Sequence, residues 1–105
     1  MADHRRVNTA CHTSAVIAAR SRWSRIELRE AVSGECGRVI EACDDAEAFE
    51  LSRRYVPDVI VLSGDDALAK IRRDGELASV PVICVGAHAD VAWLTAQVRA
   101  ALHRA

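Results

Sequence analysis

Two polar segments directly follow apolar, strand-like segments, at positions where α/β proteins commonly carry their chemistry. Ser63 follows Val59–Leu62, and Arg20–Ser21 follows Ala15–Ala19. If both apolar segments are parallel strands of one sheet, their carboxyl ends meet where such sheets bind ligands. A guanidinium beside a hydroxyl there is suited to an anion such as phosphate. The alternatives are an Arg20 that is solvated or paired with Asp65, and a Ser63 that only caps a turn.

The other reactive side chains form no recognisable catalytic or metal-binding pattern. Asp65 and Asp66 follow Ser63, and we interpret them as ordinary N-cap residues of a helix rather than as metal ligands. The cysteines include no C-x-x-C pair and no histidine at zinc-finger spacing, so we interpret them as free thiols. We expect Cys84 to be a small buried hydrophobe and His88 to be an exposed loop residue. No catalytic residue, metal or cofactor is predicted.

The composition narrows the class of protein. The chain has 105 residues, of which 50% are hydrophobic, and a net charge of −1, which predicts one domain with a single core. This charge creates no overall field that would attract nucleic acid, so direct nucleic-acid binding is not expected. No apolar segment approaches the ~20 residues of a membrane helix, and no signal-like segment follows the N-terminus. We therefore expect a cytoplasmic protein without membrane contact.

Strand-like and helix-like segments alternate along the chain. The segment Pro57–Ser63 has no polar face and indicates a strand covered by helices on both sides, as does Pro81–Val85. The predicted strands are Ala15–Ala19, Val39–Cys43, Pro57–Ser63 and Pro81–Val85, and the predicted helices are Trp23–Val32, Asp45–Tyr55, Ala67–Arg73 and Asp90–His103. With right-handed crossovers, this order predicts a doubly wound α/β domain over residues 14–105. Residues 1–13 are polar and aperiodic, so we expect a flexible tail.

The helices carry more specific predictions. Asp44 and Glu47 have the spacing of a capping box at the start of the second helix, and Asp65 or Asp66 is expected to cap the third. Trp23 and Ile26 widen the apolar arc of the first helix beyond the stripe that one-sided packing buries. Trp93 lies at the border of the apolar face of the last helix. A tryptophan in such a place is either a lid over the sheet or an anchor for a partner.

Several segments resemble the receiver domain of response regulators. The first are L-R-E-A-V at Leu28–Val32, V-I-E-A-C-D-D-A-E-A-F-E-L at Val39–Leu51 and P-D-V-I-V-L at Pro57–Leu62. The segment A-L-A-K-I-R-R-D-G-E-L-A-S-V-P-V-I at Ala67–Ile83 resembles the third helix and fourth strand of the family, and Asp90–Ala105 resembles its terminal helix. The resemblance covers residues 15–105. It implies a flavodoxin-like fold and a role in bacterial signalling.

The residues that perform phosphorylation in receivers are replaced in this chain. Receivers use an aspartate after the third strand, an acidic pair for Mg²⁺ after the first, a serine or threonine after the fourth and a lysine after the fifth. Ser63, Arg20–Ser21 and Gly86 stand at the first three of these positions, and no counterpart of the fifth strand is recognisable. Mg²⁺ sites normally need a carboxylate, and a serine hydroxyl is a poor nucleophile without a base. We therefore predict a degenerate receiver that is not phosphorylated.

The segment that would hold the fourth helix and fifth strand of the family is also missing after Gly86. This leaves four strands in the order 2-1-3-4, with Pro81–Val85 as a bare apolar edge. Exposed apolar edges tend to associate with other chains. We expect a homodimer through the fourth strand or the terminal helix, or another protein partner on that surface, unless the terminal helix covers the edge with Trp93 as a lid. The predicted interaction residues are Trp23, Ile26, Val82, Val85 and Trp93.

These observations favour a phosphorylation-independent, receiver-like regulatory protein. It would act by protein–protein interaction in a bacterial signal-transduction or transcription pathway. The alternative is a sensor of a small molecule or anion at the Arg20/Ser63 end of the sheet. An enzyme is not supported, because no suitable set of nucleophile, base and electrophile is recognisable.

Overall fold

One parallel four-stranded sheet forms the centre of the molecule in the computed structural model, which describes residues 13–86 and 90–103. Its strands are β1 (Ser14–Ala18), β2 (Arg38–Ala42), β3 (Val59–Leu62) and β4 (Val82–Cys84). They pair in the order β2-β1-β3-β4, and every pair is parallel. The predicted fold class and strand order are thus confirmed. The predicted tail lies almost wholly in residues 1–12, outside the described residues, and His88 also lies outside them.

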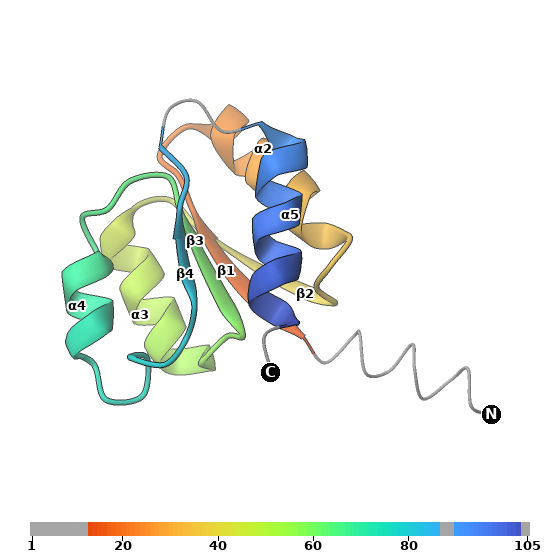
Figure 1. Cartoon of the computed structure of the whole chain (residues 1–105). Coiled ribbons are helices and arrows are strands. Elements are labelled where there is room, and N and C mark those ends of the chain that lie inside the picture. Colours follow the sequence, from red (N-terminus) through yellow and green to blue (C-terminus); the bar gives the residue numbers. More distant parts are fainter. Residues whose placement is uncertain (1–12, 87–89, 104–105) are drawn as a thin grey trace.

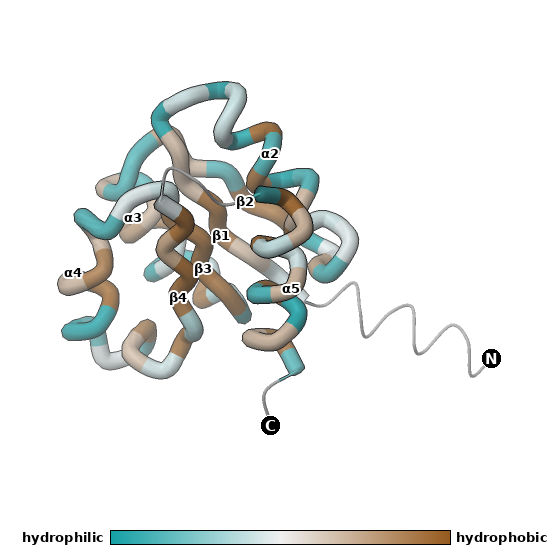
Figure 2. The backbone as a smooth tube through the Cα atoms, turned by 45° about the horizontal axis from the view of Figure 1, so that its top comes forward, coloured by the Kyte–Doolittle hydropathy of each residue, from teal (hydrophilic) through white to brown (hydrophobic). Residues whose placement is uncertain are grey.

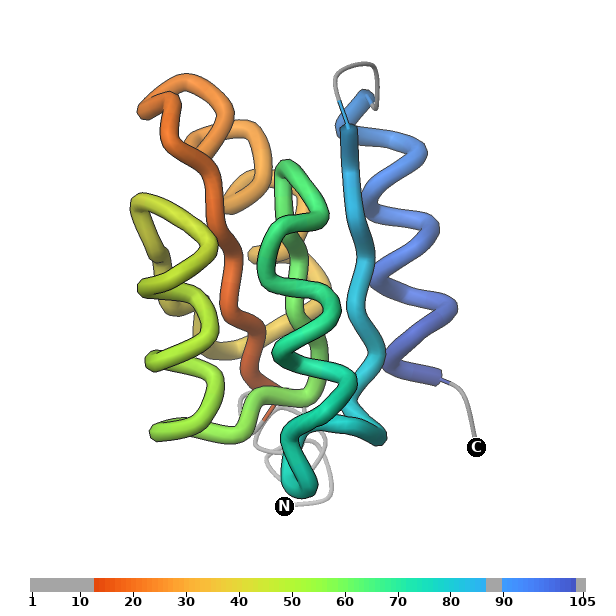
Figure 3. Tube along the Cα trace, turned by 90° about the vertical axis from the view of Figure 1, so that its left-hand side faces the viewer, coloured from red at the N-terminus to blue at the C-terminus, as the bar shows by residue number. Residues whose placement is uncertain are grey.

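Two layers of helices cover the sheet (Figures 1 and 3). The helices are α2 (Arg22–Ser33), α3 (Asp45–Tyr55), α4 (Leu68–Arg73) and α5 (Val91–Leu102). Helices α2 and α5 pack on one face, while α3 and α4 pack on the other. The bounds of α3 are those predicted, and the other elements differ from the prediction by one or two residues at an end.

The two central strands supply side chains to both layers. In β1, Val16 faces the α3–α4 layer and Ile17 faces the α2–α5 layer; in β3, Ile60 and Val61 divide in the same way. All four are fully buried, as expected of parallel strands with helices on both faces. Figure 2 shows the resulting pattern, with hydrophobic residues concentrated in the sheet and hydrophilic residues in the surrounding helices and loops.

The predicted capping box is present, but the predicted cap of the third helix is wrong. A carboxylate oxygen of Asp44 accepts from the Glu47 amide at 2.8 Å, and the Glu47 side chain accepts from the Cys43 amide at 2.6 Å. Ala67 occupies the N-cap position of α4 and makes no side-chain cap bond there. Its amide instead donates to the Asp45 carboxylate at 3.0 Å. The loop after β3 passes the start of α3, so the neighbouring helix supplies the carboxylate.

The prediction that β4 is buried on both faces is wrong. Val82 and Ile83 are half-buried, and Cys84 is exposed rather than a buried hydrophobe. The reason is that β4 is an edge strand, with a neighbouring strand on one side only. The apolar composition of this strand therefore reflects something other than full burial.

Candidate functional site

Three strand ends meet at Ser63. The Ser63 amide donates to the Ala18 carbonyl at 3.0 Å, and the Gly86 amide donates to the Ser63 carbonyl at 3.1 Å. These bonds extend the β1–β3–β4 ladder by one step at the carboxyl end of the sheet. Ser63 is half-buried between its neighbours. Gly86 has a φ of +73°, a left-handed conformation that glycine adopts without strain and that turns the chain away from β4.

The segment after β1 serves mainly to start α2. Ser21 is the N-cap residue, and its hydroxyl accepts from the Ser24 amide at 3.4 Å. Arg20 is exposed. The sequence analysis instead placed both residues in a possible anion site together with Ser63.

Arg25 also lies at this end of the sheet, and the sequence analysis did not single it out. One of its guanidinium nitrogens donates to the Ala19 carbonyl at 2.8 Å and to the Arg20 carbonyl at 3.0 Å. Its Nε lies 4.0 Å from a carboxylate oxygen of Glu41 on β2. The carbonyls of the two residues after β1 therefore already have a cationic partner. Its positive charge disfavours binding of a metal ion at this position. No local sequence pattern distinguishes Arg25 from the other arginines of α2.

A hollow of about 240 Å³ lies at this end of the sheet. Its lining residues are Arg20, Asp44, Asp45, Ala46, Asp66, Ala67 and Lys70. Three carboxylates thus face two cations, and two of these carboxylates already accept hydrogen bonds from backbone amides. Ser63 lies outside this lining, so this hollow does not join Arg20 to Ser63. An anion site at the Arg20/Ser63 end stays a prediction.

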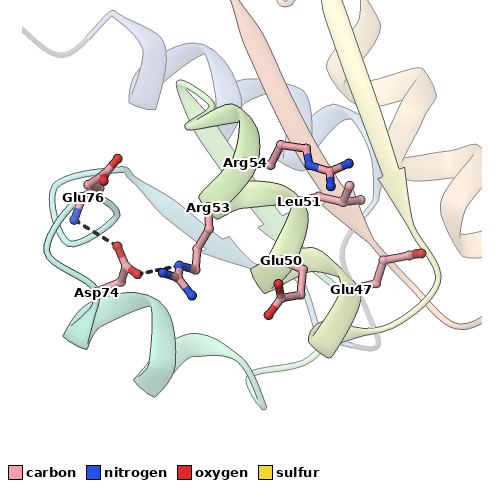
Figure 4. Close-up of a pocket in the computed structure, with 7 residues that line it drawn as sticks. All are labelled: Glu47, Glu50, Leu51, Arg53, Arg54, Asp74 and Glu76. Atoms are coloured by element: carbon pink, nitrogen blue, oxygen red, sulfur yellow. Dashed lines mark hydrogen bonds and ion pairs between the residues drawn. The ribbon is translucent and has the colours of Figure 1, made fainter.

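A larger groove of about 540 Å³ runs along the outer side of α3 (Figure 4). Arg53 forms an ion pair with Asp74 at 3.3 Å, and Asp74 also accepts from the Glu76 amide at 2.9 Å. Glu47, Glu50, Leu51 and Arg54 complete the lining, which therefore carries charges of both signs. Such exposed pairs contribute little to stability, and their mixed charges favour no single charge in a ligand.

The pKa shifts of two thiols disfavour nucleophilic chemistry at their positions. Burial raises the pKa of Cys36 to about 11, with the nearby carboxylate of Asp58 as a smaller cause. Partial desolvation, followed by the charge of Asp65, also raises the pKa of Cys84. Both thiols are therefore largely protonated at neutral pH, and the thiolate is the reactive form. Within residues 13–86 and 90–103, no cluster of three or more His, Cys, Asp or Glu side chains is arranged to hold a metal.

A third hollow, of about 520 Å³, crosses the outer edge of β4. Its floor is the segment Ser79–Ile83, and its walls are Arg72 of α4 and Gln97, Ala100 and Ala101 of α5. The floor is largely apolar, and Val82 and Ile83 are only half-buried. We call the outer side of β4, together with these walls, the β4 edge surface.

The exposed side of α5 next to this surface carries no charge. Ala92, Trp93, Ala96, Gln97 and Ala100 are all exposed. The one charged residue of α5, Arg99, is held away from them by two hydrogen bonds to Glu35, at 3.2 and 3.1 Å. A charge-free exposed helix face is unusual on a protein surface and is typical of a contact area.

The predicted interaction residues are exposed or half-buried, and only Val82 of them lines the hollow at β4. Trp93 is 42% exposed, and Val85 is half-buried against the α2–α5 layer. Trp23 and Ile26 of α2 are 77% and 46% exposed, and they do not line the hollow at β4. The structure places Gln97 and Ala100, rather than Trp93, beside the exposed edge. Trp93 as a lid or anchor stays a prediction.

Comparison with known proteins shows the fold. No family model matches the chain, and no curated protein is significantly similar to it. Among solved structures, the chemotaxis response regulator CheY4 of Vibrio cholerae is 14% identical, with a TM-score of 0.72, over 86% of this chain and 98% of its own. A response regulator receiver modulated diguanylate cyclase from Pelobacter carbinolicus is 22% identical, with a TM-score of 0.71, over 86% and 92%. A response regulator from Desulfuromonas acetoxidans is 20% identical, with a TM-score of 0.60, over 76% and 71%.

The chain therefore has a receiver-like fold, as the sequence resemblance implied. Because these identities are low, they show the fold and not the activity. No helix in the described part of the chain is long and apolar enough to cross a membrane.

Proposed function

We propose that this chain is a receiver-like regulatory module of bacterial signal transduction or transcription control that acts in the cytoplasm. It works by contact with a protein partner, without phosphorylation and without catalysis of its own. The observation that carries the proposal is the composition of the carboxyl end of the sheet. Ser63 follows β3, and the guanidinium of Arg25 donates to the carbonyls of Ala19 and Arg20, the two residues after β1.

Phosphorylation of a receiver needs a carboxylate nucleophile and a bound Mg²⁺ to neutralise the incoming phosphoryl group. No general base is identified for the hydroxyl of Ser63, and a serine hydroxyl without such a base is a poor nucleophile. Mg²⁺ prefers carboxylate oxygens and water molecules as ligands. The side chains near the end of β1 are instead the positively charged Arg20 and Arg25. The serine in place of a carboxylate nucleophile and the arginines near the end of β1 both disfavour uptake of a phosphoryl group.

The contact half of the proposal is supported by the β4 edge surface. This surface combines an open strand edge, an apolar floor and an uncharged helix face. Open apolar edges are association sites unless they are covered or charged. The partner is either a second copy of the chain or another protein that uses the same surface.

Incubation with acetyl phosphate or phosphoramidate and Mg²⁺, followed by intact mass spectrometry, tests the first half. We expect no stable gain of a phosphoryl group, while a functional receiver labelled in parallel acts as the positive control. A gain that disappears in Ser63→Ala would overturn the proposal, because it would identify Ser63 as an acceptor.

A further inference from the structure

The outer edge of β4 exposes backbone groups as well as apolar side chains. On its inner side, Pro81 accepts a hydrogen bond from β3 at 3.0 Å, and Val85 donates one to β3 at 2.8 Å. The backbone groups of successive residues in a strand point alternately to its two sides. Since residues 81 and 85 turn toward β3, Val82 and Cys84 turn their N–H and C=O groups toward the open edge. Pro81 has no amide hydrogen, but its backbone groups face β3, so the open edge loses no donor.

We propose that this edge binds a second copy of the chain, with the two β4 strands antiparallel around a two-fold axis at Ile83. The proposal rests on the proposed function, which assigns the β4 edge surface to protein contact. In this register, Val82 of one copy lies opposite Cys84 of the other, and each such pair exchanges two backbone hydrogen bonds. The pairing therefore uses every outward-turned group of these two residues.

The short length of β4 determines this register. The strand spans only Val82–Cys84. An axis at either of these terminal residues would pair the other one with a residue beyond the strand. With the axis at Ile83, both outward-turned residues find their partners within the two strands.

The charges beside β4 complement one another under this symmetry. Arg72 lines the hollow together with Pro81 and Val82, toward the amino end of the strand. Asp65 belongs to the loop that follows β3, at the carboxyl end of the sheet. A two-fold axis reverses the strand direction, so Arg72 of each copy faces Asp65 of the other. An isologous interface repeats this pair twice.

The α5 side of the surface fits the same arrangement. A two-fold axis through the sheet keeps equivalent layers on the same side, so the α5 helices of the two copies lie next to each other. The walls that α5 contributes, Gln97, Ala100 and Ala101, are small or uncharged. Two such helices can approach closely without desolvating a charge. Arg72 is the one charged residue that lines the hollow at β4, and a single charge is not enough to select a strongly acidic partner instead.

Charge reversal tests the proposed symmetry in the full chain. By sedimentation velocity in reducing buffer, we expect a dimer at micromolar concentration. We expect Arg72→Glu and Asp65→Lys each to weaken it by about tenfold or more, because like charges then face each other twice. The double variant should restore the wild-type affinity. Arg73→Glu and Asp66→Lys are the matched controls: both residues are exposed, Arg73 does not line the hollow at β4, and Asp66 lines the hollow beside the start of α3 instead.

Disulfide trapping tests the register. Opposite residues in a hydrogen-bonded antiparallel pair have Cα atoms about 5.5 Å apart, within the range of a disulfide. Mild oxidation of the Val82→Cys variant should therefore link its new thiol to Cys84 of a second copy, and peptide mass mapping should identify the bond. Ala69→Cys, on the exposed side of α4, is the control and should give no such link.

Each outcome decides between the proposals. A monomer at all concentrations overturns this inference. So does a dimer that is insensitive to charge reversal and whose Val82→Cys variant forms no disulfide with Cys84 of a second copy. Either result leaves the proposed function intact, since another protein can use the same surface. Uptake of a phosphoryl group by a protein that still dimerises overturns the proposed function and leaves the dimer.

Discussion

The two edges of the sheet are built in opposite ways. On β2, Arg38 and Glu41 are exposed, and the guanidinium of Arg38 lies 5.0 Å from the ring centre of Tyr55. Glu41 forms an ion pair with Arg29 at 3.3 Å. On β4, the three residues Val82–Cys84 carry no charge. Proteins protect open edges with charged side chains, so β2 has the features of an edge that stays unpaired, and β4 lacks them.

The difference shows that apolar composition in a strand has two possible causes. In β3 it reflects complete burial, since all four residues have no exposed surface. In β4 it persists although the strand is half-buried or exposed. Folding leaves β4 half-buried at most, and this is the reason for the proposed contact with another chain at this edge. Variants at one edge of the sheet can therefore be compared with the unchanged edge of the same protein.

Removing the charges from β2 should have the largest effect. In Arg38→Val/Glu41→Val, both edges of the sheet are apolar and open. We expect concentration-dependent, open-ended assemblies, because a molecule with two such edges can extend a chain of copies. Dynamic light scattering should detect them. Arg54→Val/Glu50→Val, which removes the same charges from the outer side of α3, should leave the particle size unchanged.

Adding a charge to β4 should give the next largest effect. Cys84→Lys places an ammonium group on the exposed end of this strand. We expect the dimer to weaken by roughly 100-fold, as charged residues at interfaces can do, with little change in the free energy of unfolding. Sedimentation velocity measures the first quantity and urea unfolding the second. Cys43→Lys, at the equivalent end of β2, is the control; if it weakens the dimer equally, the contrast between the edges is wrong.

Loss of the Asp45 carboxylate should have a moderate effect on the flank of β4. In Asp45→Ala, the Ala67 amide at the start of α4 loses its acceptor. We expect the unfolding free energy to fall by about 1–2 kcal/mol, the usual range for a lost cap or hydrogen bond. Urea unfolding measures it. Asp45→Asn, which retains an acceptor oxygen, should recover part of the loss, and equal losses in both variants would contradict this role.

The pH dependence of the Arg99–Glu35 contact should be the smallest effect. The hydrogen bond from Arg99 lowers the pKa of Glu35 below its usual value of 4.5. A carboxyl whose pKa is lowered in the folded state stabilises the protein above its unfolded pKa, and this contribution is lost as the pH falls through the folded pKa. Urea unfolding from neutral to acidic pH, compared with Glu35→Gln, should show a shallower acid dependence in the variant. An identical dependence would mean that the pair contributes nothing.

Local patterns were sufficient to predict most of the fold. The apolar segments located all four strands, and right-handed crossovers between them were enough for the doubly wound class. The capping box at Asp44 was also predictable, because its donors and acceptors lie within four residues of one another. The candidate site was less predictable. The sequence located the strand ends near Ser63 and Arg20, but it did not indicate which side chains share a hollow.

The sequence by itself determined which segments form strands and helices, because hydrophobic period and capping act over a few residues. Only the tertiary structure decided the contacts between distant residues. Asp45 accepts from an amide 22 positions away, and Glu35 binds Arg99 across 64 positions. The packing of neighbouring elements also decided that Arg25 binds the end of β1 and that Cys84 is exposed. Such contacts depend on where each chain segment lies in space, and no local pattern of residues records that position.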